Sequence, residues 1–405
     1  MTTASLEDAL TGRMEGWALA PVLIWLLTEG RKIPEPGPLI TALAHQLESA
    51  GAPVWRLRTG LRLIHPQMFG TAVIWQRGRG GAEETQVRHG VLDSDAYLGS
   101  PIQTFNETHR TVRYRLDRLD EARDHRVLFE LAEQGARDYV IQPMTFSDGS
   151  GHFLAVATDR VDGFSDLDIS KFGLLADTLA PCFEIISKRR LSQTLMDTYL
   201  GHRTGQKVLE GLIQRGDGEA INAALWYSDL RNFTALTDAL GPERLFDMLN
   251  AYFEFVSSAV TARGGEILSF IGDAMLIIFP CNDGNEREAC QAALDSAIDA
   301  FDSLATVNFS RRRANQPEIV FGLGLDVGKV AYGNVGAPDR LAFTVIGPTV
   351  NRTARLESLT KTLGKPILMS DSFAKRVNHL ATSVGRFEMK GIPAPQEVFA
   401  LHREF

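Results

Sequence analysis

Two aspartates occupy positions in this sequence where a metal ion is readily held. Residues 223–229 (AALWYSD) have the apolar pattern of a buried strand, which ends abruptly in Asp229. Residues 264–279 have the pattern of a β-hairpin whose turn presents Asp273. Two carboxylates on adjacent strand ends can hold two metal ions around a triphosphate. Taken singly, each aspartate is more often a turn residue, so the pair needs independent support.

Two further sets of polar groups are placed to contact such a ligand. The residues after the first aspartate open a helical run, and helix-start amides at Asn232, Phe233 and Thr234 can receive phosphate oxygens. Asn351 and Arg355 are four residues apart in a segment predicted to be a helix, so their side chains project from one face. They can reach one ligand together. The alternative for Arg355 is a surface ion pair with Glu357 or Asp339.

Independent support comes from four motifs that occur in order at compatible spacing. They are residues 228–234 (SDLRNFT), 270–274 (FIGDA), 333–336 (GNVG) and 343–357 (FTVIGPTVNRTARLE). Together they resemble the class III nucleotidyl cyclase catalytic domain over about residues 220–401. The resemblance implies an α/β (α+β) domain with a ferredoxin-like βαββαβ core.

The resemblance also implies a role for each matching residue. Asp229 and Asp273 are then the metal-binding pair for two Mg²⁺ or Mn²⁺ ions per site. Asn351 orients the ribose, Arg355 stabilises charge on the reacting phosphate, and Lys390 contacts the terminal phosphates. The implied reaction is attack of the ribose 3′-oxygen on the α-phosphorus of a nucleoside triphosphate, which gives a 3′,5′-cyclic nucleotide and pyrophosphate. The implied assembly is a homodimer with shared sites.

The base pocket departs from the family pattern at Ser269, where adenine-selective members usually carry lysine and guanine-selective members tend to carry glutamate. Thr344 is a familiar variant that can still bond an exocyclic amine. Because serine both donates and accepts, it discriminates weakly between bases. We expect ATP ahead of GTP, with a pyrimidine nucleotide left open.

Two other functions compete with an active nucleotidyl cyclase. A catalytically silent module that binds nucleotide or simply dimerises would usually have lost one of the metal pair, the asparagine or the arginine, and all four are present. A diguanylate cyclase would need a Gly-Gly-acidic-acidic-Phe signature at the hairpin, which residues 270–274 do not supply.

The elements around these residues divide the chain into four predicted parts. They are a helical lead-in over residues 1–50, a sensor domain over 51–187, a helical linker over 188–218 and the cyclase domain over 219–405. Residues 138–158 indicate strand, tight turn and strand, followed by a long helix over 165–187. This order resembles the last third of a GAF-type sensor domain, although any α+β domain is an alternative. The signal, a small molecule or a protein, is not given by the sequence, and neither is the resting state, active or inhibited.

Composition limits the remaining possibilities. The 405 residues carry 42 Lys and Arg against 50 Asp and Glu, a formal charge of −8 that does not suit a nucleic-acid partner. The apolar run at residues 17–27 is shorter than the roughly 20 residues that span a bilayer. Three cysteines without CxxC spacing fit a reducing compartment. We therefore expect a cytoplasmic protein without a membrane span, whose N-terminal domain regulates the cyclase.

Overall fold

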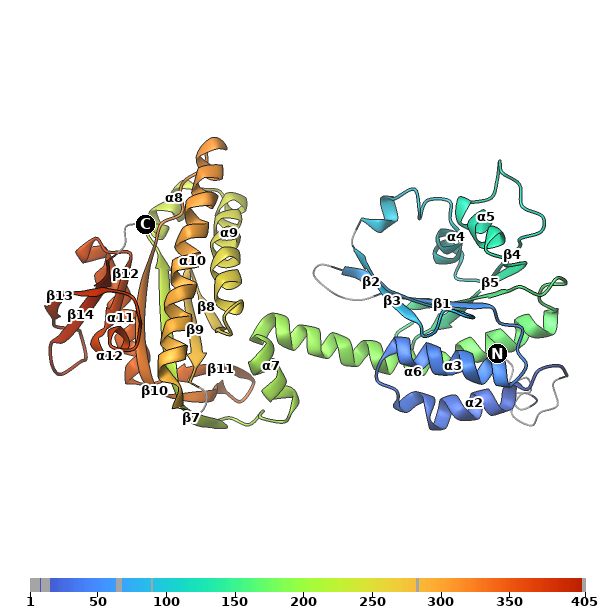
Figure 1. The fold of residues 1–405 in the computed structure, drawn as a ribbon, viewed down its shortest axis with the longest axis horizontal. Coiled ribbons are helices and arrows are strands. Elements are labelled where there is room, and N and C mark those ends of the chain that lie inside the picture. The colour runs from blue at the N-terminus through green and yellow to red at the C-terminus, as the bar shows by residue number, and fades with distance from the viewer. Residues whose placement is uncertain (1–7, 9–14, 63–67, 89, 282–283, 403–405) are drawn as a thin grey trace. The chain divides into compact units, whose positions relative to one another are not determined.

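The computed structural model describes residue 8 and residues 15–62, 68–88, 90–281 and 284–402 (Figure 1). The chain divides into two compact units, Met1–Thr194 and Leu195–Phe405. The predicted division into four parts is finer than this one and stays a prediction.

The N-terminal unit is built on a six-stranded antiparallel sheet. Its strands are β1 (Arg56–Arg62), β2 (Met68–Gln76), β3 (Glu83–Arg88), β4 (Val112–Arg115), β5 (Asp138–Thr145) and β6 (Gly151–Thr158). Their order across the sheet is β3-β2-β1-β6-β5-β4. The predicted strand-turn-strand unit is the β5–β6 hairpin, in which Asp138 pairs with Thr158 and Thr145 with Gly151.

Helices cover both faces of this sheet (Figure 1). One face carries α2 (Leu19–Thr28), α3 (Pro36–Ser49) and α6 (Asp166–Leu200), and the other carries α4 (Pro101–Thr108) and α5 (Arg126–Glu133). Short 3₁₀ turns lie at Gly30–Lys32 and Val91–Asp93. The resulting unit is an α+β sandwich, and its predicted likeness to a GAF domain is not confirmed.

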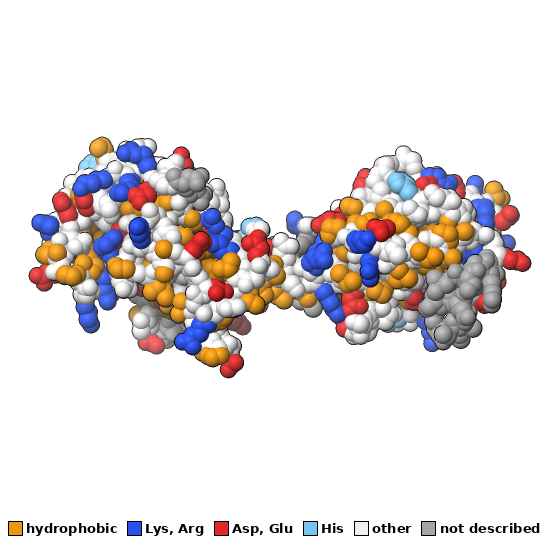
Figure 2. Space-filling view, turned by 90° about the horizontal axis from the view of Figure 1, so that it is seen from below, with side chains coloured by type: hydrophobic (Ala, Val, Ile, Leu, Met, Phe, Trp, Pro, Cys, Tyr) orange, Lys and Arg blue, Asp and Glu red, His pale blue; other side chains and the backbone are white. Residues whose placement is uncertain are grey.

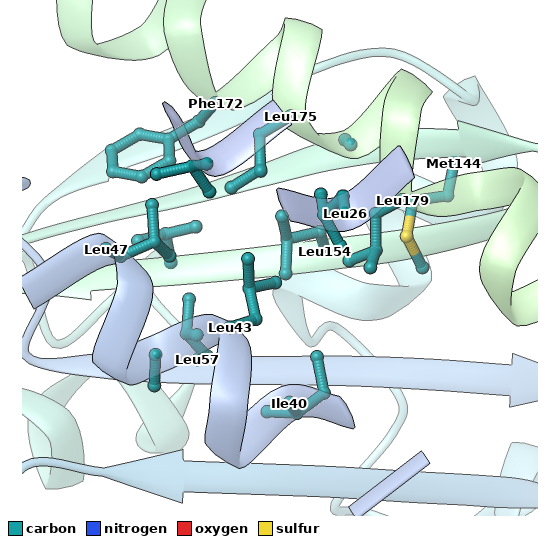
Figure 3. Packing of buried hydrophobic residues seen from close by; sticks show 14 of the residues in the cluster. Leu26, Ile40, Leu43, Leu47, Leu57, Met144, Leu154, Phe172, Leu175 and Leu179 are labelled. Carbon is teal, nitrogen blue, oxygen red and sulfur yellow. The ribbon is translucent and has the colours of Figure 1, made fainter. Parts of the chain in front are cut away.

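The larger apolar core of this unit lies between the sheet and the α2, α3 and α6 layer (Figure 3). Leu26, Leu43 and Leu175 come from the three helices and meet Leu57 and Leu154 from the sheet, and all five are buried. Burying a leucine side chain contributes about 1.5–3 kcal/mol. The helical lead-in is therefore part of the core of the N-terminal unit.

Two details of the helices differ from the expected pattern. Residues 34–38 (PEPGP) have the composition of a helix breaker, yet Pro36 begins α3, because a proline in the first turn removes no intrahelical hydrogen bond. The helix predicted to end near residue 187 continues to Leu200 as α6, and Pro181 lies inside it. The charged segment expected to be a separate linker thus begins as a continuation of this helix.

The outer side of α2 is apolar as well as exposed. Figure 2 shows hydrophobic side chains gathered over the face of the N-terminal unit that α2 occupies, and Ile24 and Leu27 are half exposed there. On α6, Ile185 is similarly exposed. Packing within this unit therefore leaves an apolar surface on these helices in water.

The C-terminal unit contains an eight-stranded sheet. Its strands are β7 (Gly218–Leu230), β8 (Glu266–Ile271), β9 (Ala274–Pro280), β10 (Phe321–Ala337), β11 (Arg340–Ile346), β12 (Ile367–Ser370), β13 (Ala381–Phe387) and β14 (Gln396–Leu401). Their order is β13-β14-β12-β10-β7-β9-β8, with β11 paired to β10.

Among the described residues of this unit, six helices accompany the sheet. They are α7 (His202–Leu209), α8 (Phe233–Ala239), α9 (Pro242–Thr261), α10 (Glu286–Arg313), α11 (Pro348–Leu363) and α12 (Asp371–Ala374). The run β7, α9, β8, β9, α10, β10 forms four antiparallel strands in the order β10-β7-β9-β8. This arrangement confirms the predicted ferredoxin-like βαββαβ core.

The two faces of this sheet are covered differently. Helices α9 and α10 bury one face through a core that includes Trp226, Tyr252 and Phe321. Helix α11 lies on the other face, and it approaches β10 closely because Gly324 has no side chain. A Cβ atom on Gly324 would lie 2.3 Å from the carbonyl oxygen of Thr353. The position of α11 therefore depends on this glycine.

Among the helices that the structure describes, none combines the length and the apolar character needed to cross a membrane.

Candidate active site

The β7–β9 pairing brings the two predicted metal aspartates to the same end of the sheet. Ser228 of β7 lies opposite Met275 of β9 in antiparallel register. Asp229 follows the first of these residues, and Asp273 lies in the turn just before β9. Residues far apart in the sequence thus become neighbours through one strand pairing.

The two carboxylates interact directly. The pKa of Asp229 is raised to about 7, first by burial, then by a hydrogen bond with Asp273 and the negative charges of Asp273 and Glu357. The Oδ1 atom of Asp229 is buried without a hydrogen-bond partner. Two carboxylates this close relieve their repulsion by sharing one proton or one cation.

This donor set fits a hard divalent cation. The described residues contain no group of three or more His, Cys, Asp or Glu side chains arranged to hold a metal ion. The pair is therefore an incomplete site by itself. Mg²⁺ typically binds proteins through one or two carboxylates and takes its remaining ligands from water and substrate phosphates.

Three residues near the aspartates were not among the predicted site residues. Glu357 is buried on α11, and burial raises its pKa while the charge of Arg231 lowers it. The Arg231 guanidinium donates a 2.7 Å hydrogen bond to the hydroxyl of Thr360. Residues 357 and 360 are three apart in α11, so both lie on the side of the helix that faces the sheet. This spacing is the feature of the sequence that could have indicated them as neighbours of the site.

The segment after Asp229 forms the predicted helix start. Asn232 adopts a left-handed conformation with φ of 59°, which asparagine tolerates better than most residues. Phe233 is the first residue of α8 and Thr234 is exposed beside it. The first amides of a helix lack intrahelical acceptors and so remain available to an anion.

Asn351 and Arg355 do not meet the aspartates of their own chain. The sheet-facing side of α11 contains the buried residues Thr353 and Thr360. Asn351 and Arg355 are exposed and project from the side of the helix away from the sheet. Because Glu357 lies on the sheet side, the predicted alternative of an ion pair between it and Arg355 finds no support.

Lys390 is also remote from these aspartates. It lies in the loop between β13 and β14. Strand β14 runs parallel to β7, because β7–β10 and β12–β14 are antiparallel pairs and β10–β12 is parallel. The loop before β14 therefore lies at the end of the sheet where β7 begins, whereas Asp229 lies where β7 ends.

The two predicted base-contacting residues lie on neighbouring strands. Ser269 is half-buried on β8 opposite Leu276, and Thr344 is half-buried on β11 opposite Gly333. Strand β11 also contacts β8. The same hairpin thus carries Ser269 on its first strand and Asp273 in its turn.

Helix α7 is fixed to the strand that carries Ser269. The amide and hydroxyl of Thr204 donate to Glu266 Oε1 on β8 at 3.0 and 2.6 Å. The hydroxyl of Tyr332 on β10 donates to the same carboxylate at 3.1 and 3.2 Å. Helix α7, which follows α6 in the chain, is thereby hydrogen-bonded to the sheet that carries the two aspartates.

The C-terminal part of the chain is similar in sequence to known proteins. Residues 218–403 match the sequence model of the family described as the adenylate and guanylate cyclase catalytic domain. An adenylate cyclase of Anabaena cylindrica is 32% identical over 168 residues, which cover 41% of this chain and 33% of that protein. Adenylate cyclase 1 of Rhizobium meliloti is 32% identical over 149 residues, covering 36% of this chain and 22% of that protein. The matched part of this chain thus spans a third or less of these relatives.

One solved structure is also similar to this chain. The crystal structure of the adenylyl cyclase CyaB from P. aeruginosa is 26% identical, with a TM-score of 0.43, and the match covers 46% of this chain and 97% of that one.

We expect Asp229→Asn to remove both the pH sensitivity and the cation response of this site. Because the folded-state pKa lies above the ordinary value of about 4, the carboxyl stabilises the fold when protonated. This contribution is lost as pH rises from about 4 to about 7. A cation at 100 times its Kd would stabilise the wild type by about 2.7 kcal/mol. Thermal unfolding across this pH range, in EDTA or excess Mg²⁺, measures both effects.

Asp238→Asn is the matched control, because Asp238 is an exposed carboxylate on α8. It should keep the full response to Mg²⁺. Equal stabilisation of Asp229→Asn and wild type by Mg²⁺ would contradict the assignment of the carboxylate pair.

Proposed function

Because residues 218–403 belong to the adenylate and guanylate cyclase catalytic domain family, we propose that this domain is a nucleotidyl cyclase. It converts a nucleoside triphosphate, ATP ahead of GTP, to the 3′,5′-cyclic nucleotide and pyrophosphate. The observation that carries the proposal is the carboxylate pair of Asp229 and Asp273, which has one buried oxygen without a partner. The two 32% identical adenylate cyclases support ATP as the substrate.

Asp229 and Asp273 would hold two Mg²⁺ or Mn²⁺ ions. When bound, these ions lower the pKa of the ribose 3′-hydroxyl and neutralise charge on the triphosphate. Because the pKa of Asp229 is raised to about 7, a substantial fraction of these carboxyls carries a proton at neutral pH, and a cation competes with that proton. Cation binding at neutral pH therefore releases that proton.

The remaining residues position the substrate. The first amides of α8 are placed to receive phosphate oxygens next to the aspartates. The Asn351 side chain orients the ribose, and the Arg355 guanidinium stabilises the negative charge that develops on the reacting phosphate. Both roles follow the family pattern, as does contact between Lys390 and the terminal phosphates. Holding the 3′-oxygen in line with the α-phosphorus makes the attack effectively unimolecular.

The active form is a homodimer with two shared sites. In one chain, Asn351 and Arg355 project away from the sheet that carries Asp229 and Asp273, so neither set is complete alone. A two-fold dimer places the aspartates of each chain opposite the Asn/Arg pair of its partner. The half-exposed apolar side chains of Ile24 on α2 and Ile185 on α6 support association of two chains.

The N-terminal unit regulates this reaction in our proposal. Helix α6 belongs to the core of that unit and continues to Leu200, and α7 follows it directly. The hydrogen bonds between Thr204 and Glu266 then join α7 to β8. A rotation of the helix is thereby transmitted to the hairpin that carries Ser269 and Asp273. The three cysteines are free thiols, which fits the cytoplasm as the compartment.

Product analysis tests the activity. The full chain is incubated separately with ATP, GTP, CTP and UTP in Mg²⁺ or Mn²⁺, and products are identified by mass spectrometry. We expect 3′,5′-cyclic AMP as the main product. Asp273→Ala should reduce the rate by about 100-fold or more, because it removes cation and triphosphate charge stabilisation. Asp238→Ala should retain activity, and no cyclic nucleotide from any of the four substrates would refute the proposal.

Subunit mixing tests the shared site. Homodimers of Asp229→Ala and of Asn351→Ala should each be nearly inactive. In a mixed dimer both lesions fall in one site and the other site is intact. Random exchange makes half of the dimers mixed, so the mixture should recover about a quarter of wild-type activity. Persistent inactivity after proven subunit exchange would exclude a shared site.

Substitution of Ser269 tests the base pocket. Ser269→Lys should raise the ATP/GTP ratio of kcat/KM by about 10-fold or more, because a charged donor favours adenine N1 and opposes the N–H of guanine. Ser269→Ala is the control, since it removes the hydroxyl without adding charge. An unchanged ratio in Ser269→Lys would mean that residue 269 does not face the base.

A further inference from the structure

The N-terminal unit contains a cavity of about 200 Å³ on the α4 and α5 side of its sheet. Its floor is formed by β1, β2, β5 and β6, and residues of α4, α5 and the 3₁₀ turn at Val91–Asp93 close it from above. This cavity belongs to a different unit of the chain from the aspartate pair.

The cavity exists because small residues line the sheet beneath it. They are Gly60, Gly70, Ala72, Ala155 and Ala157. Such residues remove volume from an interior that would otherwise be close-packed. Gly60 has a second effect, since a Cβ atom there would lie 2.3 Å from the ring of Phe153. The glycine thus lets this ring lie against β1 as part of the cavity wall.

Two arginines on the central strand β1 line this cavity. Arg56 and Arg58 are two residues apart, so both side chains lie on one face of the strand, and both are half-buried. The Nε atom of each is buried and has no hydrogen-bond partner. Within the described part of the chain, neither guanidinium forms an ion pair, and no acidic residue lines the cavity.

Two neighbouring cations without a counter-charge are costly inside a protein. Burial lowers the pKa of Arg56, and the charge of Arg58 lowers it further. A bound anion would satisfy both guanidinium groups by charge-assisted hydrogen bonds. The two neighbouring guanidinium charges, in a lining without acidic residues, therefore favour an anionic ligand.

The other residues that line the cavity indicate the apolar part of the ligand. Leu92, Ile102, Val127 and Leu131 give the cavity an apolar side opposite the arginines. A cavity of about 150 Å³ already accepts benzene, so the volume here allows one ring or a short branched chain together with an anionic head. A fully hydrated inorganic anion would leave this apolar wall unfilled.

We infer that this cavity binds a small carboxylate with a single-ring or branched apolar body, whose carboxylate contacts Arg56 and Arg58. The inference goes beyond the proposed cyclase activity and does not depend on it. It names a ligand class for the N-terminal unit, and direct binding tests it without any assay of the catalytic domain.

The test is calorimetric titration of the full chain with three probes. Benzoate carries both the ring and the charge, benzamide keeps the shape without the charge, and inorganic phosphate has charge without a ring. Benzoate should bind at least 10-fold more tightly than either of the others. Arg58→Gln should weaken benzoate binding by about 10- to 100-fold, because one charge-assisted contact is lost, and should leave benzamide binding unchanged.

Arg118→Gln is the matched control, because Arg118 is 80% exposed in the same unit and should not alter binding. Arg56→Gln provides a second variant if Arg58→Gln does not fold, as judged by thermal unfolding. Ala72→Leu, which fills the cavity and keeps both arginines, should also abolish benzoate binding. The inference would be overturned if benzamide or phosphate bound as tightly as benzoate. It would also be overturned if benzoate did not bind the folded chain, or if a folded arginine variant kept the full benzoate affinity.

Discussion

The repulsion between Asp229 and Asp273 is the constraint on which the C-terminal unit depends. Antiparallel pairing of β7 with β9 brings the two carboxylates together, and burial together with the negative charge of Asp273 then makes ionisation of Asp229 unfavourable. The surrounding fold tolerates this cost, because Trp226 and Met275 on the same strands are buried in a large apolar core. A stable sheet can therefore hold a pair of groups that is unfavourable until a cation reaches it.

Helix α11 separates the two halves of the proposed site. Its inner face packs on β10 around Gly324 and includes Glu357, which adds negative charge near the aspartates. Its outer face carries Asn351 and Arg355 into solvent. One helix thus presents one face to the sheet and the other to solvent. Rotation of α11 by half a turn about its axis would exchange these two faces. Close packing at Gly324 prevents that rotation, so completing the site requires a second chain in our proposal.

The N-terminal unit contains the opposite electrostatic arrangement. There, Arg56 and Arg58 have no acidic partner in the described cavity, and small residues leave space in front of them. In both units a sheet with an extensive apolar core holds two like-charged side chains close together at a defined place. Such arrangements are typical of binding sites, because a structural role alone would favour a partner of opposite charge.

Local patterns in the sequence were enough for much of this protein. Strand ends and turns indicated Asp229 and Asp273 as a candidate pair, helical spacing predicted that Asn351 and Arg355 share one face, and the ferredoxin-like core followed from the family motifs. These features depend on residues close together in the chain or on motifs with a known order. Only the tertiary structure placed Glu357 near the aspartates, turned Arg355 away from them, and joined Arg56 and Arg58 to an apolar cavity. Those relations depend on strand order, helix rotation and the volume left between distant elements, and none of these has a local sequence signal.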